Sequence, residues 1–503
     1  SILVLGTGGR EYAIVKRLRE DSVKLNENIN IICIQTNLNH KIKDYANVVI
    51  ECNLLEELTN TLTQIVDCNY IILSIVGSED FLIKGVGDFF KLRGIPCIGP
   101  TLACSKLETS KTFCRTFIDN IKELNKYNPK FDVYCSKKAF LYDLDSLKNK
   151  YNEFVIKKDG LHRGKGVFVQ GYDFDNTIES ISSLNLNNSP LVIEEKLIGE
   201  EFSLMSLIDH NNNICHFPPI RDYKRLENEN KGCNTGGMGC VIDSKNMLPF
   251  LTQEDIEECQ NINKIIVNNF NFGNVYTGIL YGSFIKTDNC IKIIEYNCRF
   301  GDPECIIALN LLQNNFYDVC NNFITGTLKT LTFSNDACIC VYIVPKSYCN
   351  KAEKNNKYDL YLNKEMEKYI TYSNIEVLDN HLYSVGSRCF ALTYTSNNLY
   401  NCYQDIYNIL NNIHGNIHYR TDIGKKFLSS YEASGVSITE ASKSLNEIKH
   451  SILNTYNENV ISEYGSFGGE YKLGDHILVS SIDGVGTKTL LSKIWKGVNG
   501  FVN

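Results

Sequence analysis

The chain opens with Ser1-Ile2-Leu3-Val4-Leu5-Gly6-Thr7-Gly8-Gly9-Arg10-Glu11, where an apolar run passes directly into a glycine-rich turn. We predict a strand over residues 1–5 and a helix over residues 12–19. The apolar runs at residues 29–34 and 70–76 predict two further strands, separated by helical stretches. Strands that alternate with helices are typical of a parallel α/β sheet. The sequence therefore predicts an N-terminal α/β domain, which we place at residues 1–105.

The glycine turn after the first strand directs backbone N–H groups at a helix N-terminus, where anions bind. A dinucleotide site would need a third glycine where Glu11 stands. It would also need an acidic residue at the end of the second strand, which carries Gln35-Thr36-Asn37 instead. The turn therefore either binds a phosphate or another small anion, or serves only as a tight turn.

Composition limits the classes of function. The 503 residues are 43% hydrophobic and 22% charged, with a net charge of −7. At about 150 residues per domain, this length predicts three or four domains. The negative charge offers no basic surface for nucleic acid, and no apolar run approaches the roughly 20 residues that span a bilayer. No signal peptide is visible, and Ser1 in place of Met fits ordinary processing or a chain cut at its start. We expect a cytoplasmic protein.

The 20 cysteines are scattered and form no CxxC pair. Disulfide frameworks are typical of small secreted chains rather than of a long chain with this pattern. We therefore expect a reducing compartment, in which cysteine serves as a small buried hydrophobic residue.

A second glycine-rich loop lies between two short predicted strands, residues 154–158 and 167–169. The loop is Asp159-Gly160-Leu161-His162-Arg163-Gly164-Lys165-Gly166, with three glycines and two basic residues. It is either a flexible flap that binds phosphates through N–H groups and Lys165, or a solvated hairpin tip. Strands are also predicted at residues 191–197 and 204–209. A long loop-rich passage follows at residues 222–239, where glycines beside Arg225 and Asn234 favour a role in binding anions.

Near the middle of the chain, the apolar run at residues 291–294 predicts a strand that ends in Glu295-Tyr296-Asn297. Residues two apart in a strand face the same way, so the side-chain oxygens of Glu295 and Asn297 point at one spot. A carboxylate and an amide oxygen suit a hard cation such as Mg²⁺ that is bridged to nucleotide phosphates. The alternative is a capped strand end with surface charges.

Eight motifs in order resemble the phosphoribosylamine–glycine ligase (glycinamide ribonucleotide synthetase) family of ATP-grasp enzymes. They are GGRE, SK, VIKKDGLHRGKGV, VIEEKLIGEEFS, DYKR, GCNTGGMG, YTGILY and IEYNCRFGDPE, and the match closes with RTDIG at residues 420–424. The resemblance implies an α/β and α+β multidomain fold. Its parts would be a parallel-sheet domain (1–105), an ATP-grasp region (106–325, with a flap subdomain at about 122–190) and a small β-rich domain (326–425).

The resemblance also implies a reaction in purine biosynthesis. ATP phosphorylates the carboxylate of glycine, and the amine of 5-phosphoribosylamine then attacks the acyl carbon. The products are glycinamide ribonucleotide, ADP and phosphate, and the expected cofactor ion is Mg²⁺ or Mn²⁺. Carboxylates react poorly with amines until phosphorylation supplies a leaving group, so the enzyme must hold phosphates by charge and exclude water. The partners would be the two substrates and other enzymes of the same pathway.

The resemblance assigns roles residue by residue. For ATP these are the phosphate lysines Lys111 and Lys157, the flap residues Gly160, Gly164, Lys165 and Gly166, the adenine hinge Glu195, Lys196 and Leu197, and the ribose acceptor Glu201. The metal ligands would be Glu295 and Asn297. Glycine and phosphoribosylamine would be bound by Gly9, Arg10, Asp222, Lys224, Asn234 and Gly236, and the catalytic charges would be Arg225, Arg299 and Asp302.

Four positions depart from the family pattern: Tyr12, Tyr223, the pair His162-Arg163, and Cys233. Tyrosine in place of the usual histidine keeps an aromatic hydrogen-bonding group but loses a possible imidazolium. We expect these changes to affect substrate affinity rather than the class of reaction. A catalytically impaired remnant or scaffold is the alternative function.

Residues 426–503 differ from the rest. The stretches at 431–436, 465–469 and 481–488 resemble the start of aminoimidazole ribonucleotide synthetase (phosphoribosylformylglycinamidine cyclo-ligase). The segment of roughly 75 residues is short for a domain of that kind. We therefore expect no cyclo-ligase activity, and a segment that is partly disordered or pairs with another chain.

Overall fold

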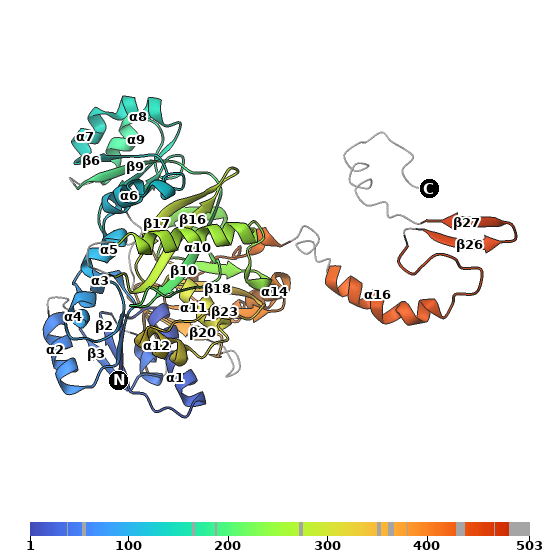
Figure 1. The fold of residues 1–503 in the computed structure, drawn as a ribbon, viewed down its shortest axis with the longest axis horizontal. Helices are drawn as coiled ribbons and strands as arrows, with labels where there is room; N and C mark the ends of the chain where they lie inside the picture. The colour runs from blue at the N-terminus through green and yellow to red at the C-terminus, as the bar shows by residue number, and fades with distance from the viewer. Residues whose placement is uncertain are drawn as a thin grey trace. The chain divides into compact units, whose positions relative to one another are not determined.

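The computed structural model describes residues 1–37, 39–52, 57–162, 166–186, 189–270, 275–349, 354–360, 367–379, 381–428, 438–466 and 468–481. The chain divides into two compact units, Ser1–Leu428 and Ser429–Asn503 (Figure 1). Every residue to which we assigned a role falls within the first unit. No helix in these ranges is long and apolar enough to cross a membrane.

The first unit begins with the predicted parallel sheet, which is confirmed. Its order is β3-β2-β1-β4-β5, and every pairing is parallel. The strands are β1 (Ile2–Leu5), β2 (Ile31–Gln35), β3 (Val48–Glu51), β4 (Leu73–Val76) and β5 (Cys97–Ile98). The helical segments are α1 (Gly9–Lys24), η1 (His40–Asp44), α2 (Leu58–Cys68), α3 (Glu79–Leu82) and α4 (Val86–Leu92). Helix α1 begins earlier than predicted because the Glu11 carboxylate accepts a bond from Gly8 N, which caps the helix at once.

The central region contains two four-stranded sheets, ordered β6-β9-β7-β8 and β11-β10-β16-β17. The first comprises β6 (Phe131–Tyr134), β7 (Phe154–Lys158), β8 (Val167–Val169) and β9 (Leu191–Glu195). The second comprises β10 (Glu200–Ile208), β11 (Ile214–His216), β16 (Gly278–Lys286) and β17 (Ile291–Asn297). Figure 1 shows α10 (Gln253–Asn268) lying along the β10–β16 pair. The other helices are α5 (Leu102–Thr109), α6 (Lys111–Asp119), η2 (Lys122–Leu124), α7 (Lys137–Tyr142), α8 (Leu144–Lys150) and α9 (Ile178–Ser183).

The passage at residues 222–239, which we predicted to be rich in loops, contains short strands instead. It forms β12 (Arg221–Asp222), β13 (Arg225–Glu227), η3 (Asn228–Asn230), β14 (Lys231–Asn234) and β15 (Gly239–Ile242). Strands of two to four residues are too short to produce a recognisable alternation of polar and apolar side chains. Strands β13 and β14 pair as an antiparallel hairpin, and β12 pairs with β15. The backbone around Arg225 and Asn234 is therefore held by ladder hydrogen bonds.

Strand β15 continues into a sheet that extends into the C-terminal domain, with the order β12-β15-β18-β23-β20 and β25 paired to β18. A second sheet has the order β21-β22-β19-β24. The strands are β18 (Ala337–Pro345), β19 (Lys354–Leu360), β20 (Ile370–Tyr372), β21 (Ile375–Leu378), β22 (His381–Val385), β23 (Phe390–Ser396), β24 (Ile413–Gly415) and β25 (Ile417–His418). Among the described residues of this unit, the remaining helical segments are η4 (Ser244–Asn246), α11 (Glu304–Leu311), α12 (Phe316–Thr325), α14 (Leu399–Leu410) and η5 (Lys425–Phe427). This domain is α+β, as predicted.

Cysteine is used mainly as predicted, with one exception. Eighteen cysteines are free, and fifteen of these are buried. Cys233 and Cys349, however, form a disulfide across 116 residues of sequence. We expected no disulfide, because neither spacing nor composition relates these two positions.

The second unit, described by itself, contains α16 (Ile438–Leu453) and a hairpin of β26 (Gly469–Leu473) and β27 (His476–Ser480). Both strands are exposed along their full length, including the apolar side chains of Leu473, Ile477 and Val479. A two-stranded hairpin of this kind is marginally stable by itself.

Candidate active site

A buried ion cluster holds the first of the predicted phosphate lysines. Lys157, on β7, places its Nζ 2.8 Å from Glu194 Oε2 on the neighbouring β9. Arg115, on α6, binds the same carboxylate with two bonds, Nε to Oε1 at 2.7 Å and Nη2 to Oε2 at 2.8 Å. Burial disfavours both charges, lowering the pKa of Lys157, while the two cations keep the pKa of Glu194 below its ordinary value. Glu194 therefore positions Lys157 beside β17, where its Nζ donates to Ile294 O at 3.1 Å.

The second phosphate lysine lies at the base of the flap. Lys111 begins α6, and its Nζ donates to Gly160 O at 3.0 Å. Asp159 fixes the same corner by accepting bonds from Ser110 Oγ at 3.2 Å and Thr112 N at 3.3 Å. Gly160 has a φ of +92°, which favours glycine. The start of α6 and the base of the flap therefore form one structure.

Part of the flap lies outside the described residues, including Gly164, Lys165 and Arg163. Gly166 is described, and a Cβ there would come within 2.7 Å of the His162 ring. Because glycine has no side chain, the strand that returns from the flap can pass close to His162 at position 166.

The predicted adenine hinge begins at Glu195, the last residue of β9. The backbone N–H groups of Glu195 and Lys196 already donate, to Lys130 O and to Glu153 O, each at 3.0 Å. The Lys196 side chain binds Glu153 Oε2 at 2.9 Å, while Leu197 is half-buried and Glu201 is exposed on β10. Of the three hinge residues, Leu197 is the one whose N–H has no backbone acceptor among the residues that the structure describes. A base at this hinge would bind there.

Glu295 and Asn297 lie on one face of β17, opposite Ser283 and Tyr281 of β16. Burial opposes the Glu295 charge, but Lys224 and Lys157 outweigh it and lower the pKa of Glu295, so the carboxylate is ionised. The described ranges contain no group of three or more His, Cys, Asp or Glu side chains arranged to hold a metal. Two protein oxygens nevertheless fit Mg²⁺, which usually takes one or two carboxylates and completes its shell with phosphates and water.

Lys224 connects the predicted metal pair to a second acidic group. Its Nζ lies 3.9 Å from Glu295 Oε1 and 3.8 Å from Asp222 Oδ2. Burial works against this charge, yet the carboxylates of Asp222 and Glu295 raise the pKa of Lys224. Beyond Asp222 lies Glu304, a residue to which we assigned no role, which accepts a bond from Tyr281 Oη at 2.7 Å. Burial, reinforced by Asp222, raises the pKa of Glu304 to about 7.

The Glu304 carboxyl predicts a pH-dependent contribution to stability. Because its native pKa of about 7 exceeds the ordinary 4.5, the unfolded chain releases this proton first. The contribution is fully present below about pH 4.5 and is lost as the pH rises through about 7, with a magnitude of about 3 kcal/mol. Urea unfolding across this range should show the stability of the wild type falling relative to Glu304→Gln. Asp222→Asn should move the midpoint to lower pH, and parallel profiles for wild type and Glu304→Gln would contradict the assignment.

The two arginines predicted as catalytic charges are both held by carboxylates. Arg225 binds Asp173 with two bonds of 2.9 and 3.0 Å and also donates to Gly232 O at 2.9 Å. Arg299 lies 3.3 Å from Glu79 Oε2 and 3.0 Å from Glu108 Oε1, which joins its loop to α3 and α5. These contacts do not test a role toward substrate, so the catalytic roles of both arginines stay predictions.

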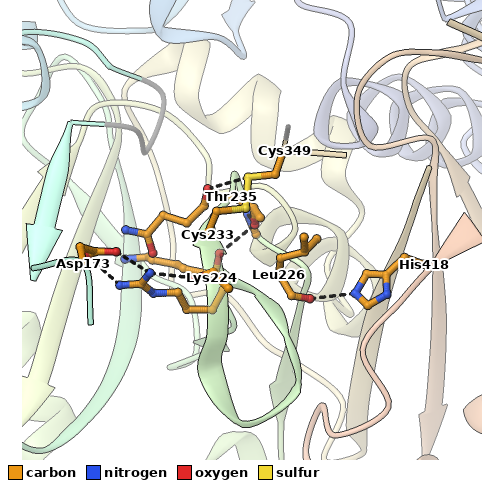
Figure 2. Close-up of a disulfide and its surroundings, with 11 residues drawn as sticks. Asp173, Lys224, Leu226, Cys233, Thr235, Cys349 and His418 are labelled. Atoms are coloured by element: carbon orange, nitrogen blue, oxygen red, sulfur yellow. Dashed lines mark hydrogen bonds and ion pairs between the residues drawn. A yellow bond between two sulfur atoms is a disulfide. The ribbon is translucent and has the colours of Figure 1, made fainter. Parts of the chain in front are cut away.

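The disulfide joins the β13–β14 hairpin to the C-terminal domain, because Cys233 lies in β14 and Cys349 follows β18. Figure 2 shows Cys233 and Cys349 next to Lys224, whose carbonyl accepts from Thr235 N and Oγ1, both at 2.8 Å. Asn234 O is 3.5 Å from Cys349 Sγ. On the other side, His418 Nε2 lies 3.0 Å from Leu226 O (Figure 2). The C-terminal domain therefore holds the β13–β14 hairpin from two directions.

The predicted substrate residues of the N-terminal turn meet the loop after β17. Arg10 donates to Phe300 O at 2.8 Å, and its Nε lies 2.6 Å from Glu11 Oε1. A Cβ on Gly9 would stand 2.2 Å from Tyr342 Oη, so the close approach requires glycine there. Asp302 accepts from that hydroxyl at 2.7 Å. Motifs about 290 residues apart in sequence are thus in contact.

Two departures from the family pattern lie in the core rather than at these loops. The Tyr12 ring packs edge-on against Tyr45 and Tyr372, with centroids 5.6 and 5.7 Å away. Tyr223 is buried, and its hydroxyl accepts a bond from Gly424 N at 3.1 Å. Both tyrosines join the core of the C-terminal domain.

Four residues near the predicted site were not predicted from the sequence: Arg115, Glu194, Tyr342 and Arg388. Arg115 lies four residues after the SK motif, and Glu194 lies within the motif VIEEKLIGEEFS, where a carboxylate directly after the apolar run of β9 was the available signal. Tyr342 and Arg388 lie in the C-terminal domain, where no motif was recognised before residue 418.

Comparisons with known proteins agree over the first unit. The N domain of phosphoribosylglycinamide synthetase matches residues 1–108, its ATP-grasp (A) domain residues 109–305, and its C domain residues 338–426. A phosphoribosylamine–glycine ligase of Methanocella arvoryzae is 33% identical over 439 residues, covering 85% of this chain and 96% of that protein. One of Methanosarcina barkeri is 32% identical over 435 residues, covering 84% and 96%. The crystal structure of the Thermotoga maritima ligase has the same fold, with a TM-score of 0.66, 24% identity, and coverage of 84% of this chain and 99% of that one.

Proposed function

Because this chain belongs to the phosphoribosylamine–glycine ligase family, we propose that its first unit joins glycine to 5-phosphoribosylamine through glycyl phosphate. The reaction is the ATP-dependent synthesis of glycinamide ribonucleotide in purine biosynthesis. The observation that carries the proposal is a row of charges, Lys157, Glu295, Lys224 and Asp222, between the predicted phosphate site and the predicted substrate loops. Lys157 donates to Ile294 O beside Glu295, the Glu295 carboxylate interacts electrostatically with Lys157 and Lys224, and Lys224 lies between Glu295 and Asp222. A phosphoryl donor at one end and its acceptors at the other could react across this line of charges.

Each group of the predicted site has a chemical task. Lys111 and Lys157 would neutralise the transferred phosphoryl group, and the glycine flap would cover it and exclude water. Glu295 and Asn297 would hold Mg²⁺ or Mn²⁺, which supplies charge stabilisation at the phosphates when bound. Lys224, kept charged by its two carboxylates, would steer the carboxylate of glycine toward the same place. No side chain of the set has to act as a covalent nucleophile.

The test is ADP release from the purified full-length chain. We expect release only when ATP, Mg²⁺, glycine and phosphoribosylamine are all present, with equimolar glycinamide ribonucleotide identified by mass spectrometry. Omitting each component in turn provides the controls. No ADP above the minus-glycine background would indicate an impaired remnant or scaffold. ADP formation with another amino acid in place of glycine would indicate a different acceptor.

For the second unit, our proposal is narrower. Residues 426–503 would be a partial relative of aminoimidazole ribonucleotide synthetase without cyclo-ligase activity, serving self-association or association with other enzymes of the pathway. The exposed apolar strands β26 and β27 support association. Its Asp483 and Lys488, which match a nucleotide-handling motif, lie outside the described residues. ATP-dependent cyclisation of formylglycinamidine ribonucleotide by this chain would contradict the proposal. We place the enzyme in the cytoplasm.

A further inference from the structure

Arg388, in the turn before β23, makes a set of contacts to which neither the motifs nor the proposed reaction assigns a role. Its Nη1 lies 2.7 Å from Gly236 O, 3.1 Å from Gly237 O and 2.8 Å from Asp302 O. Its Nη2 donates to Asp302 Oδ2 at 2.8 Å. One guanidinium from the C-terminal domain therefore holds two loops, the one that follows β14 and the one that follows β17.

The Tyr342 ring packs against the Arg388 guanidinium. Its ring centroid lies 4.4 Å from the Arg388 Cζ atom, and its hydroxyl donates to Asp302 Oδ1. Both carboxylate oxygens of Asp302 are thus occupied by residues of the C-terminal domain. The side chains of Arg388 and Asp302 are only 14% and 8% exposed, so their ion pair is largely removed from solvent. Such a pair fixes geometry more strongly than a surface pair does.

Close contacts at Gly236 and Gly237 restrict the loop that follows β14. A Cβ on Gly236 would lie 3.2 Å from Arg388 Cζ. Gly237 has a φ of +114°, and a Cβ there would lie 2.8 Å from Pro303 Cδ. The planar fork of arginine serves several carbonyls at once, which a lysine ammonium on a flexible stem does less well.

We propose that Arg388 is a positioning residue for the acceptor substrate, holding the loop at residues 234–237 against Asp302 so that phosphoribosylamine meets an ordered surface. This inference rests on the proposed function. The acceptor is favoured over ATP because the predicted ATP residues cluster around Lys157 and the flap. The Arg388 group instead adjoins the N-terminal glycine turn, where a Cβ on Gly8 would lie 3.0 Å from Asp302 Oδ2.

The test uses the full-length chain with Arg388→Met and Arg388→Lys. We expect Arg388→Met to raise the KM for phosphoribosylamine at least about 10-fold, as expected for loss of a charge-assisted hydrogen-bond set worth more than about 1.4 kcal/mol. The KM for ATP and the calorimetric affinity for ADP should change less than about twofold. Arg388→Lys should recover part of the lost affinity because it restores the contact with Asp302. The matched control is Arg93→Met, which removes a guanidinium 3.7 Å from the Phe89 ring on the N-terminal domain and should change none of these values.

Hydrogen exchange gives a second measurement that does not depend on activity. Arg388→Met should speed exchange at residues 234–239 and leave residues 154–160 unchanged. An unchanged KM for phosphoribosylamine, an equal rise in the KM for ATP, or unchanged exchange at residues 234–239 would each overturn the proposal. An inactive wild type would instead overturn the proposed function, and the exchange measurement would still decide whether Arg388 holds the loop.

Discussion

Glu295→Ala should lower the turnover number by at least about 100-fold. The variant removes the one carboxylate of the predicted metal pair, and a metal that stabilises transferring phosphoryl groups contributes several kcal/mol to the barrier. It also removes one of the negative charges that face Lys224 and Lys157, which keep Asp222 and Glu194 respectively. Steady-state ADP release measured across a Mg²⁺ titration gives both the maximal rate and the apparent metal affinity. We expect both to fall, and Mn²⁺ to recover part of the rate.

Two variants make this result specific to the metal pair. Glu295→Asp keeps the charge on a shorter stem and should retain more activity than Glu295→Ala. Glu258→Ala removes a carboxylate that binds Tyr127 Oη at 2.6 Å in the same central region and should leave turnover unchanged. Full turnover by Glu295→Ala at saturating Mg²⁺ would show that the metal is held elsewhere.

Glu194→Gln should lower the free energy of unfolding by about 3–5 kcal/mol. The substitution removes the carboxylate that pairs with both Arg115 and Lys157, and it leaves two buried cations without a counter-charge. Lys157 should then lose its fixed position, so the KM for ATP should rise together with the loss of stability. Urea unfolding followed by circular dichroism measures the first effect, and steady-state kinetics measures the second.

The chain offers a matched control for Glu194 in Glu153, which pairs with Lys196 at 2.9 Å but is 43% exposed. Glu153→Gln breaks a lysine–glutamate pair of the same kind near solvent and should lower stability by less than about 1 kcal/mol. Equal losses for the two variants would mean that burial does not set the strength of the Glu194 cluster.

Much of the fold could be predicted because its signals are local. The apolar runs and the glycine turn predicted the parallel sheet, and the alternation at Glu295 and Asn297 correctly placed both on one face of β17. Contacts between residues that lie far apart in the sequence could not be predicted. Nothing in the sequence around Arg225 indicates Asp173 as its partner, and nothing around Asp302 indicates Arg388, 86 residues away. These pairs depend on how whole sheets are stacked, which no short motif encodes.

The ladder between β15 and β18 has a consequence for the order of events during synthesis. Gly239 pairs with Val341, so the strand that ends the predicted acceptor loop must wait for a partner made about 100 residues later. On the ribosome, the nucleotide-binding half can begin to fold while that edge is still unpaired. We therefore expect the predicted acceptor side to be completed last, so that a nascent chain gains affinity for nucleotide before affinity for the sugar phosphate.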